Sequence, residues 1–228
     1  KVPNELEPTF AVRDYGVSMS DEDIKRTYTV FFKSSKNDSN DQIGGFGLGA
    51  KLPFAYTDQF TVTTFLNNQK TVYLACKENS LPVLKKVLTT PSNEPRGVLI
   101  EVPVKEGDQY TFVRALSDFS KYSTFNMKYS DESIRKNAMV NTDLQLFLDQ
   151  FNPNIKLYNN SNRYDSELII RLGGVAYDLG NGRRQLFNSF DLAHRIERKI
   201  SRKIGVHDWD VLSIEDGTSV VVDFPVGS

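Results

Sequence analysis

Two glycine-containing motifs carry the groups in this chain that are best suited to chemistry. The first is Asp14-Tyr15-Gly16, and the second is the run Ile43–Lys51 (IGGFGLGAK), which starts about thirty residues later and contains four glycines. Glycines allow backbone N–H groups to approach a ligand, and a helix that follows them directs its positive end at the same point. Such a loop suits phosphate, and the upstream carboxylate suits the exocyclic amine of a base. Together the motifs predict a nucleotide held at both ends.

Other phosphate-binding motifs fit the glycine run poorly. A P-loop needs GxxxxGK followed by Ser or Thr. Ala50 takes the lysine position in one register and the second-glycine position in the other, where Leu52 also replaces the hydroxyl residue. The dinucleotide fingerprint is met in form by Gly45, Gly47 and Ala50, but it should follow a buried strand and precede an acidic residue by about 20 positions. A polar run precedes it here, and the region near Phe65 has no acidic residue.

That polar run, Lys33–Gln42, has no apolar residue and therefore predicts a mobile loop or lid. Ser34, Ser35 and Lys36 stand at its start, where they either close on a terminal phosphate or belong to a solvated loop. Lys51, just after the glycines, either reaches a phosphate or lies on a solvated surface. The residue types favour neither alternative.

Hydrophobic spacing predicts the elements that position these motifs. Ser20 with Asp23 is a helix start, and Ile24, Tyr28, Phe31 and Phe32 form one face of the helix. We expect strands at Thr9–Arg13, Phe60–Leu66, Thr71–Cys76, Gly97–Val104 and Leu168–Leu172. We expect helices at Leu52–Tyr56, Tyr110–Phe119, Ser130–Phe151 (with its start left open) and near Phe190–Lys203.

Loops and turns are predicted from polar and glycine-rich stretches. Asn67–Lys70 turns one strand into the next, Asn152–Asn162 resembles a linker, and a turn surrounds Asp178–Gly182. A last hairpin is expected to pair Asp210–Ile214 with Ser219–Phe224. The helix near Phe190–Lys203 is rich in Arg and Lys; it offers a nucleic-acid or membrane-surface patch, although a solvated face is the better interpretation.

Bulk composition excludes several classes of protein. The net charge of −1 over 228 residues favours neither nucleic acid nor an anionic membrane, and no apolar run has membrane-spanning length. The first residues do not resemble a signal peptide. The single Cys76 permits no internal disulfide, and His194 and His207 have no partners at metal-ligand spacing, so no metal site is assigned. The abrupt ends suggest a piece of a larger protein.

In motif order and spacing the chain resembles the GHKL ATP-binding family, which includes gyrase B, MutL, a heat-shock chaperone and histidine-kinase catalytic domains. Asp14–Ser18, followed by Met19, is similar to the family's DxGxG adenine motif, and Gly44–Gly49 is similar to its GxxGxG motif, with the lid between them. The resemblance implies a Bergerat-type fold that binds ATP and Mg²⁺. It implies adenine contacts from Asp14, Gly16 and Met19, and phosphate contacts from the residues Gly45, Phe46, Gly47, Leu48, Gly49 and Lys51.

Two departures from the family pattern matter. Ser18 stands where the second glycine of DxGxG is usual, so its side chain either crowds the base or points away. The family's first motif, a helix with a general-base Glu and a magnesium-binding Asn, should lie several tens of residues before Asp14. No catalytic residue is therefore assigned, and whether this chain is an Mg-dependent ATPase stays open. A histidine-kinase-like phosphotransferase is another functional class. Neither His194 nor His207 lies in a phosphoacceptor context, which argues against it.

A narrower resemblance is to the phage rIIA-type lysis-inhibition proteins. It is carried by the strings FKSSK, GGFGLGAKLPFAYT, LGGVAYDLG at Leu172–Gly180, and DFPVGS at the end. It implies a cytoplasmic location in the host, with peripheral association with the inner membrane left open, and an rIIB-type partner or a homodimer. The alternative is a non-catalytic interaction module with a vestigial nucleotide site.

The expected fold class is α+β. We expect an α/β sandwich ATP-binding domain at residues 1–125 and a smaller, incomplete S5-like transducer domain at residues 150–228, with the boundary between 120 and 165.

Overall fold

The computed structural model describes residues 1–30, 49–124, 127–131, 134, 139–140, 142–150, 152–159, 168–178, 198, 202 and 218–224. The chain divides into two compact units, which are described separately. Unit 1 contains Lys1–Ala115 and Lys128–Glu132, and unit 2 contains Leu116–Met127 and Ser133–Ser228. Among the helices described, none combines the length and the apolarity needed to cross a bilayer.

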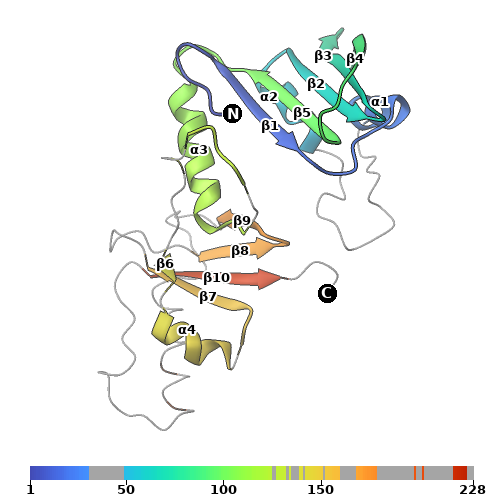
Figure 1. Ribbon diagram of the computed structural model, residues 1–228. Coiled ribbons are helices and arrows are strands. Elements are labelled where there is room, and N and C mark those ends of the chain that lie inside the picture. The colour runs from blue at the N-terminus through green and yellow to red at the C-terminus, as the bar shows by residue number, and fades with distance from the viewer. Residues whose placement is uncertain are drawn as a thin grey trace. The chain divides into compact units, whose positions relative to one another are not determined.

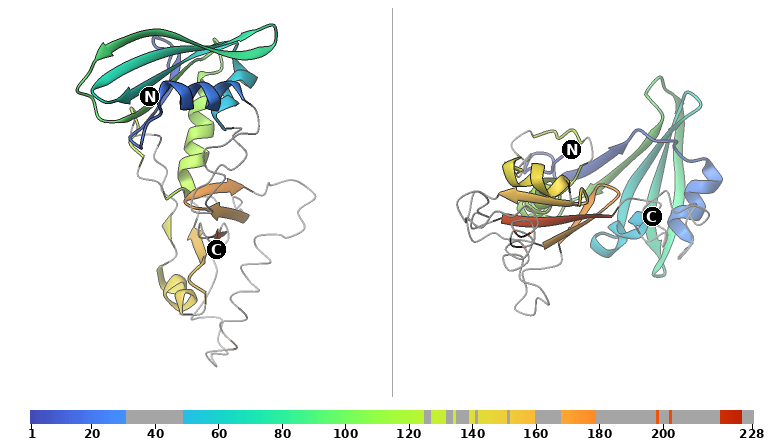
Figure 2. Two further views of the ribbon diagram at one scale, coloured as in Figure 1. Left: turned by 90° about the vertical axis from the view of Figure 1, so that its right-hand side faces the viewer. Right: turned by 90° about the horizontal axis from the view of Figure 1, so that it is seen from below.

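Unit 1 is built on a five-stranded antiparallel sheet with the strand order β1-β5-β2-β3-β4 (Figure 1). Its helical segments are α1 (Asp21–Thr29), the 3₁₀ turn η1 (Gly49–Lys51) and α2 (Pro53–Tyr56). Both α1 and α2 lie on one face of the sheet (Figure 2). The strands are β1 (Thr9–Asp14), β2 (Gln59–Leu66), β3 (Gln69–Glu78), β4 (Leu81–Pro91) and β5 (Gly97–Pro103).

Local signals account for the elements nearest the motifs. The side chain of Ser20 accepts a hydrogen bond from the Asp23 N–H and caps α1, as expected. Pro53 occupies the first turn of α2, where its missing N–H costs nothing. Asn67 and Asn68 both have positive φ, 53° and 58°, which is the geometry of a two-residue hairpin turn between β2 and β3.

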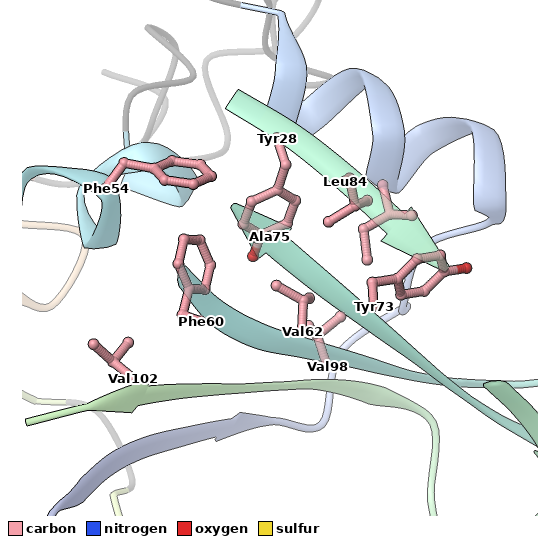
Figure 3. Close-up of a cluster of buried hydrophobic side chains, with 10 residues drawn as sticks. Tyr28, Phe54, Phe60, Val62, Tyr73, Ala75, Leu84, Val98 and Val102 are labelled. Carbon is pink, nitrogen blue, oxygen red and sulfur yellow. The ribbon is translucent and has the colours of Figure 1, made fainter. Parts of the chain in front are cut away.

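The core of unit 1 lies between the sheet and its two helices (Figure 3). Tyr28 of α1 and Phe54 of α2 both contact Phe60 of β2, with ring centroids 5.9 and 4.8 Å apart respectively. The sheet adds Val62, Tyr73, Ala75, Leu84, Val98 and Val102, and α1 adds Ile24. Ile24 and Tyr28 are thus buried as predicted, whereas Phe31 and Phe32 lie outside the described residues.

The strand β4 was not predicted from the sequence. Of its eleven residues only Leu84 is buried, so the strand shows no alternation of apolar and polar side chains. The expected strand Gly97–Val104 is β5, which pairs with β1 on one side and with β2 on the other.

Unit 2 contains a second five-stranded sheet, with the order β6-β7-β10-β8-β9, in which β10 and β8 are parallel and the other pairs are antiparallel. The helix α4 (Thr142–Asp149) packs on β7. The strands are β6 (Met139–Val140), β7 (Ile155–Asn159), β8 (Leu168–Leu172), β9 (Val175–Asp178) and β10 (Thr218–Phe224).

Three predictions for this half were wrong. The span Ser130–Phe151 is not one helix, because β6 precedes α4. The expected linker Asn152–Asn162 contains β7, whose apolar residues were obscured by the surrounding Asn and Pro. The last hairpin does not form as expected, because β10 has β7 on one side and β8 on the other. Of the basic helix near Phe190–Lys203 the structure describes only Arg198 and Arg202, both exposed; the turn after Asp178 lies outside the described residues.

One helix belongs to both units. The helix α3 (Gln109–Tyr122) runs across the division, which falls between Ala115 and Leu116. At its unit 2 end, the Tyr122 hydroxyl donates to Ser219 Oγ at 2.9 Å, and the Tyr122 carbonyl accepts from Arg171 Nη1 at 3.0 Å. The buried Arg171 also forms a two-pronged ion pair with Asp223 and bonds the Tyr158 hydroxyl.

Candidate functional site

Asp14 is the last residue of β1 and pairs directly with Val98 of β5. Residues that face each other in an antiparallel pair project from the same side of the sheet. Val98 points into the core between the sheet and its helices. The exposed Asp14 carboxylate therefore lies on the face of the sheet that carries α1 and α2.

The two oxygens of this carboxylate have different environments. Oδ1 accepts a hydrogen bond from the Gly16 N–H at 2.7 Å, whereas Oδ2 has no hydrogen-bond partner among the described residues. A Cβ at Gly16 would lie 3.1 and 3.2 Å from the two oxygens, so a side chain at this position would crowd the carboxylate. One oxygen thus shapes the turn and the other is available to a donor.

The loop after Asp14 is tied to the start of β5. Ser18 has a φ of 65°, a left-handed conformation that favours glycine, and its hydroxyl donates to the Gly97 carbonyl at 2.9 Å. Its side chain therefore points to β5. Of the two alternatives for a serine at the second glycine position of DxGxG, the side chain points away and does not crowd the position proposed for the base. Arg96 Nη2 donates to the Val17 carbonyl at 2.9 Å.

Gly97 allows β1 and β5 to approach closely at this end. Its φ is 139°, and a Cβ there would lie 1.8 Å from the Asp14 carbonyl oxygen. Neither Arg96 nor Gly97 was predicted to be a functional residue. The available signal was an Arg-Gly pair immediately before a predicted strand, which is too common a pattern to indicate a contact with Asp14.

Arg13 precedes Asp14 in β1, and its side chain lies on the opposite face of the sheet because successive side chains alternate along a strand. Its guanidinium lies 3.8 Å from the centroid of the Phe65 ring and 4.9 Å from that of Tyr15. It also donates to the Pro95 carbonyl at 2.5 Å. The backbone that presents Asp14 is therefore held by Arg13 contacts that do not involve the Asp14 carboxylate.

The ends of the two motifs meet at one hydrophobic core. Met19, which follows the first motif, and Ala50, which follows the glycines, both pack against the cluster that contains Tyr28. This places the described ends of both motifs on the same face of the sheet. The other predicted phosphate and lid residues, which are Gly45, Phe46, Gly47, Leu48, Ser34, Ser35 and Lys36, lie outside the described residues.

Gly49 and Lys51 are described, in η1. A Cβ at Gly49 would meet no atom within 4 Å, so nothing in the described structure requires glycine there. Lys51 is buried, with 6% of its surface exposed, and Nζ donates to the Thr27 carbonyl at 2.6 Å. Burial lowers the pKa of its ammonium group. The alternative of a solvated surface lysine is therefore wrong, and Lys51 joins η1 to the last turn of α1.

No cluster of three or more His, Cys, Asp or Glu side chains able to hold a metal ion occurs in the described part of the chain. Cys76 is half-buried, as befits a residue of β3 rather than an exposed nucleophile.

The chain is similar in fold to solved structures of topoisomerase II. The ATPase region of Saccharomyces cerevisiae topoisomerase II matches 96% of this chain with a TM-score of 0.51 and 16% identity. The same region bound to ICRF-187 (dexrazoxane) matches 96% of the chain with a TM-score of 0.52 and 15% identity. This chain has the fold of that ATPase region. It is a mixed α/β fold built on two sheets.

The likeness extends through both units but not through the whole of the other proteins. This chain spans 64% and 65% of the two topoisomerase chains. Neither family models nor curated proteins give a match to this sequence.

Proposed function

We propose that this chain binds ATP with Mg²⁺, with the adenine at Asp14 and the phosphates at the glycine run Gly44–Gly49. The observation that carries the proposal is the Asp14 carboxylate, which uses one oxygen to shape its own turn and keeps the other without a partner among the described residues. The fold adds support, because the similar topoisomerase II domains are named as ATPase regions.

In this proposal each motif binds one end of the nucleotide. Asp14 Oδ2 accepts a hydrogen bond from the N6 amine, Gly16 lets the base approach the backbone, and Met19 packs beside the ring. The N–H groups of Gly45, Phe46, Gly47, Leu48 and Gly49 hold the phosphates, with Ser34, Ser35 and Lys36 closing over them. Lys51 acts through its bond to Thr27, which holds the end of the glycine run against α1.

Mg²⁺ fits this site only through the nucleotide. It is bound in many ATP sites by phosphate oxygens with one or two carboxylates, and no residue of this chain is assigned as its ligand. The general base is likewise unassigned, so we expect hydrolysis by this chain alone to be slow. Rapid turnover by the isolated chain would contradict that part of the proposal.

Titration calorimetry with Mg-ATP tests the proposal. Hydrogen bonds to charged groups contribute about 1.5–3 kcal/mol, so Asp14→Ala should weaken binding by roughly tenfold to a hundredfold. Asp58→Ala is the matched control, because Asp58 is an exposed carboxylate of unit 1 that pairs with Lys77. If ATP neither binds nor raises the melting temperature of the unmutated chain, the alternative of an interaction module with a vestigial site is favoured.

We extend the proposal to the rIIA-type lysis-inhibition proteins on the sequence strings alone. Unit 2 then acts as an S5-like transducer, the chain works in a phage-infected cell as a homodimer or with an rIIB-type protein, and nucleotide state controls the arrangement of its parts. The string LGGVAYDLG supplies the turn at Gly173 and Gly174, both with positive φ, that joins β8 to β9. ATP-dependent co-purification of this chain with an rIIB-type protein tests this extension. Unchanged lysis timing after deletion of the gene for this chain would overturn it.

A further inference from the structure

Arg13 bonds the backbone of Asp14 itself, from the face of the sheet opposite to the Asp14 carboxylate. Its Nη1 donates to the Asp14 carbonyl at 3.2 Å, and its Nη2 donates to the carbonyl of Pro95, just before β5, at 2.5 Å. The guanidinium lies 3.8 Å from the ring centre of the buried Phe65, an attractive arrangement for a cation. One side chain therefore joins the end of β1 to the segment that leads into β5.

Gly97 leaves the space in which the Arg13 bond to Asp14 forms. A Cβ at Gly97 would lie 1.8 Å from the Asp14 carbonyl oxygen and 2.9 Å from Arg13 Nη1. The acceptor and the donor of this bond thus both occupy space that a side chain would fill. The Gly97 carbonyl in turn accepts from the Ser18 hydroxyl at 2.9 Å. The residues on both sides of Asp14 are therefore tied to the same point of β5.

The bond to the Asp14 carbonyl determines where the carboxylate points. A peptide unit is planar, so fixing the Asp14 carbonyl fixes the orientation of the whole peptide between Asp14 and Tyr15. The next N–H, that of Gly16, donates to Asp14 Oδ1 at 2.7 Å. If the peptide between Asp14 and Tyr15 rotated, the Gly16 N–H would leave Oδ1, and the carboxylate would lose the bond that orients it.

We propose that Arg13 is a positioning residue that sets the direction of the Asp14 carboxylate and thereby the preference of the site for its base. The nucleotide arm of this inference rests on the proposed function. The Arg13 guanidinium contacts two backbone carbonyls and two aromatic rings, so it influences the base through Asp14 alone. Its effect on base preference should therefore disappear once the Asp14 carboxylate is removed.

Arg13→Lys separates positioning from charge and packing. Lysine keeps the positive charge and can lie over the Phe65 ring, but a single ammonium does not reproduce the fork of the planar guanidinium. Lys70→Met is the matched control, because Lys70 Nζ lies 5.9 Å from the centre of the same ring. Lys70 is on β3, which β5 and β2 separate from β1, so this control removes a neighbouring cation without changing a bond to Asp14.

Backbone ¹⁵N order parameters of the nucleotide-free chain test the positioning directly. At Tyr15 and Gly16 they should be about 0.85, as in rigid backbone, in the unmutated chain and in Lys70→Met, and below about 0.6 in Arg13→Lys. The values for residues 60–65 of β2 should stay high in all three proteins, which shows that the sheet is folded. Unchanged values at Tyr15 and Gly16 in Arg13→Lys would overturn the inference.

Calorimetry with ATP and with inosine triphosphate, which has a carbonyl in place of the N6 amine, tests the nucleotide arm. Both carry the same triphosphate, so a lost charge or a loosened fold weakens them alike and leaves the ratio of their affinities unchanged. A misdirected carboxylate weakens ATP alone. Arg13→Lys should lower the ATP-to-inosine-triphosphate affinity ratio by about tenfold, the loss expected for one hydrogen bond to a charged group, and Lys70→Met should not.

A double-mutant cycle shows whether Arg13 acts through Asp14. In an Asp14→Ala background, adding Arg13→Lys should change the affinity ratio by less than about twofold. A tenfold effect in both backgrounds, or an unchanged ratio in Arg13→Lys alone, would overturn the inference. If ATP does not bind to the unmutated chain, the proposed function fails, and the order parameters at Tyr15 and Gly16 then decide whether Arg13 sets the direction of the carboxylate.

Discussion

Replacing Asp14 by Asn should change which base the site prefers while leaving the loop folded. Asn Oδ1 can accept the Gly16 N–H bond that Asp14 Oδ1 accepts now at 2.7 Å, and Asn readily forms this kind of turn. The change is then confined to the second oxygen, which has no partner among the described residues. An acceptor becomes an NH₂ donor at the position proposed to contact the base.

The size of the effect follows from that exchange. ATP presents an amine at position 6, so it loses a charge-assisted hydrogen bond of about 1.5–3 kcal/mol in Asp14→Asn. Inosine triphosphate presents a carbonyl at position 6. In the unmutated chain this carbonyl faces the Asp14 carboxylate, which cannot donate, whereas in the variant it accepts from the Asn NH₂ group, a neutral hydrogen bond of about 0.5–1.5 kcal/mol. The two terms add to at least about 2 kcal/mol, which is roughly a 30-fold change in the ATP-to-inosine-triphosphate affinity ratio.

Calorimetry with both nucleotides, with Mg²⁺ present, measures the ratio directly. Differences at position 1 of the base are common to both proteins and cancel when the ratios are compared. Urea unfolding of Asp14→Asn should agree with that of the unmutated chain to within about 0.5 kcal/mol. A stable variant with an unchanged affinity ratio would refute the assignment of Asp14 to the base.

Three further predictions concern stability. Gly97→Ala should destabilise unit 1 by at least about 2 kcal/mol, because its Cβ would lie 1.8 Å from the Asp14 carbonyl oxygen; thermal unfolding measures this, and an unchanged melting temperature would be contrary evidence. The hydrogen bond from Lys86 is the main reason that the pKa of the Asp21 carboxyl is lowered in the folded chain. The ionised carboxylate therefore stabilises the fold above about pH 3.9, and this contribution is lost as the pH falls through the lowered pKa. The free energy of urea unfolding should exceed that of Asp21→Asn at neutral pH, and the difference should shrink below about pH 4. Arg171→Met should cost about 3–5 kcal/mol by leaving Asp223 without its partner, and adding Asp223→Leu should recover most of this loss.

Elements with strong local signals could be predicted from the sequence. The cap at Ser20, the turn at Asn67 and the proline at the start of α2 each act within four residues, so a short window contains the whole cause. Strands that depend on neighbours could not be predicted. The edge strand β4 buries only Leu84, and β7 is stabilised by pairing with β10, which is some sixty residues away in the sequence.

The candidate site divides in the same way. The Asp14–Gly16 turn is local, because the bond from the Gly16 N–H to Asp14 Oδ1 spans only two residues. The bonds that hold this turn, from Ser18 and Arg96 to residues 79 positions away, depend on how β5 returns beside β1. Burial of Lys51 against Thr27 could not be predicted either, because it depends on where η1 meets the end of α1.

The strand register links these long-range contacts to the direction of the Asp14 carboxylate. A slip of one residue between β1 and β5 would move every side chain of β1 to the other face, so Asp14 would exchange places with Arg13. Gly97 opposes such a slip, because any other residue at its position would place a Cβ 1.8 Å from the Asp14 carbonyl oxygen. Ser18 and Arg13 add hydrogen bonds that exist only in the observed register. The residues at the start of β5 therefore orient the Asp14 carboxylate without taking part in the proposed contact with the base. If the proposed function holds, substitutions there that shift the register of β1 against β5 should weaken ATP binding.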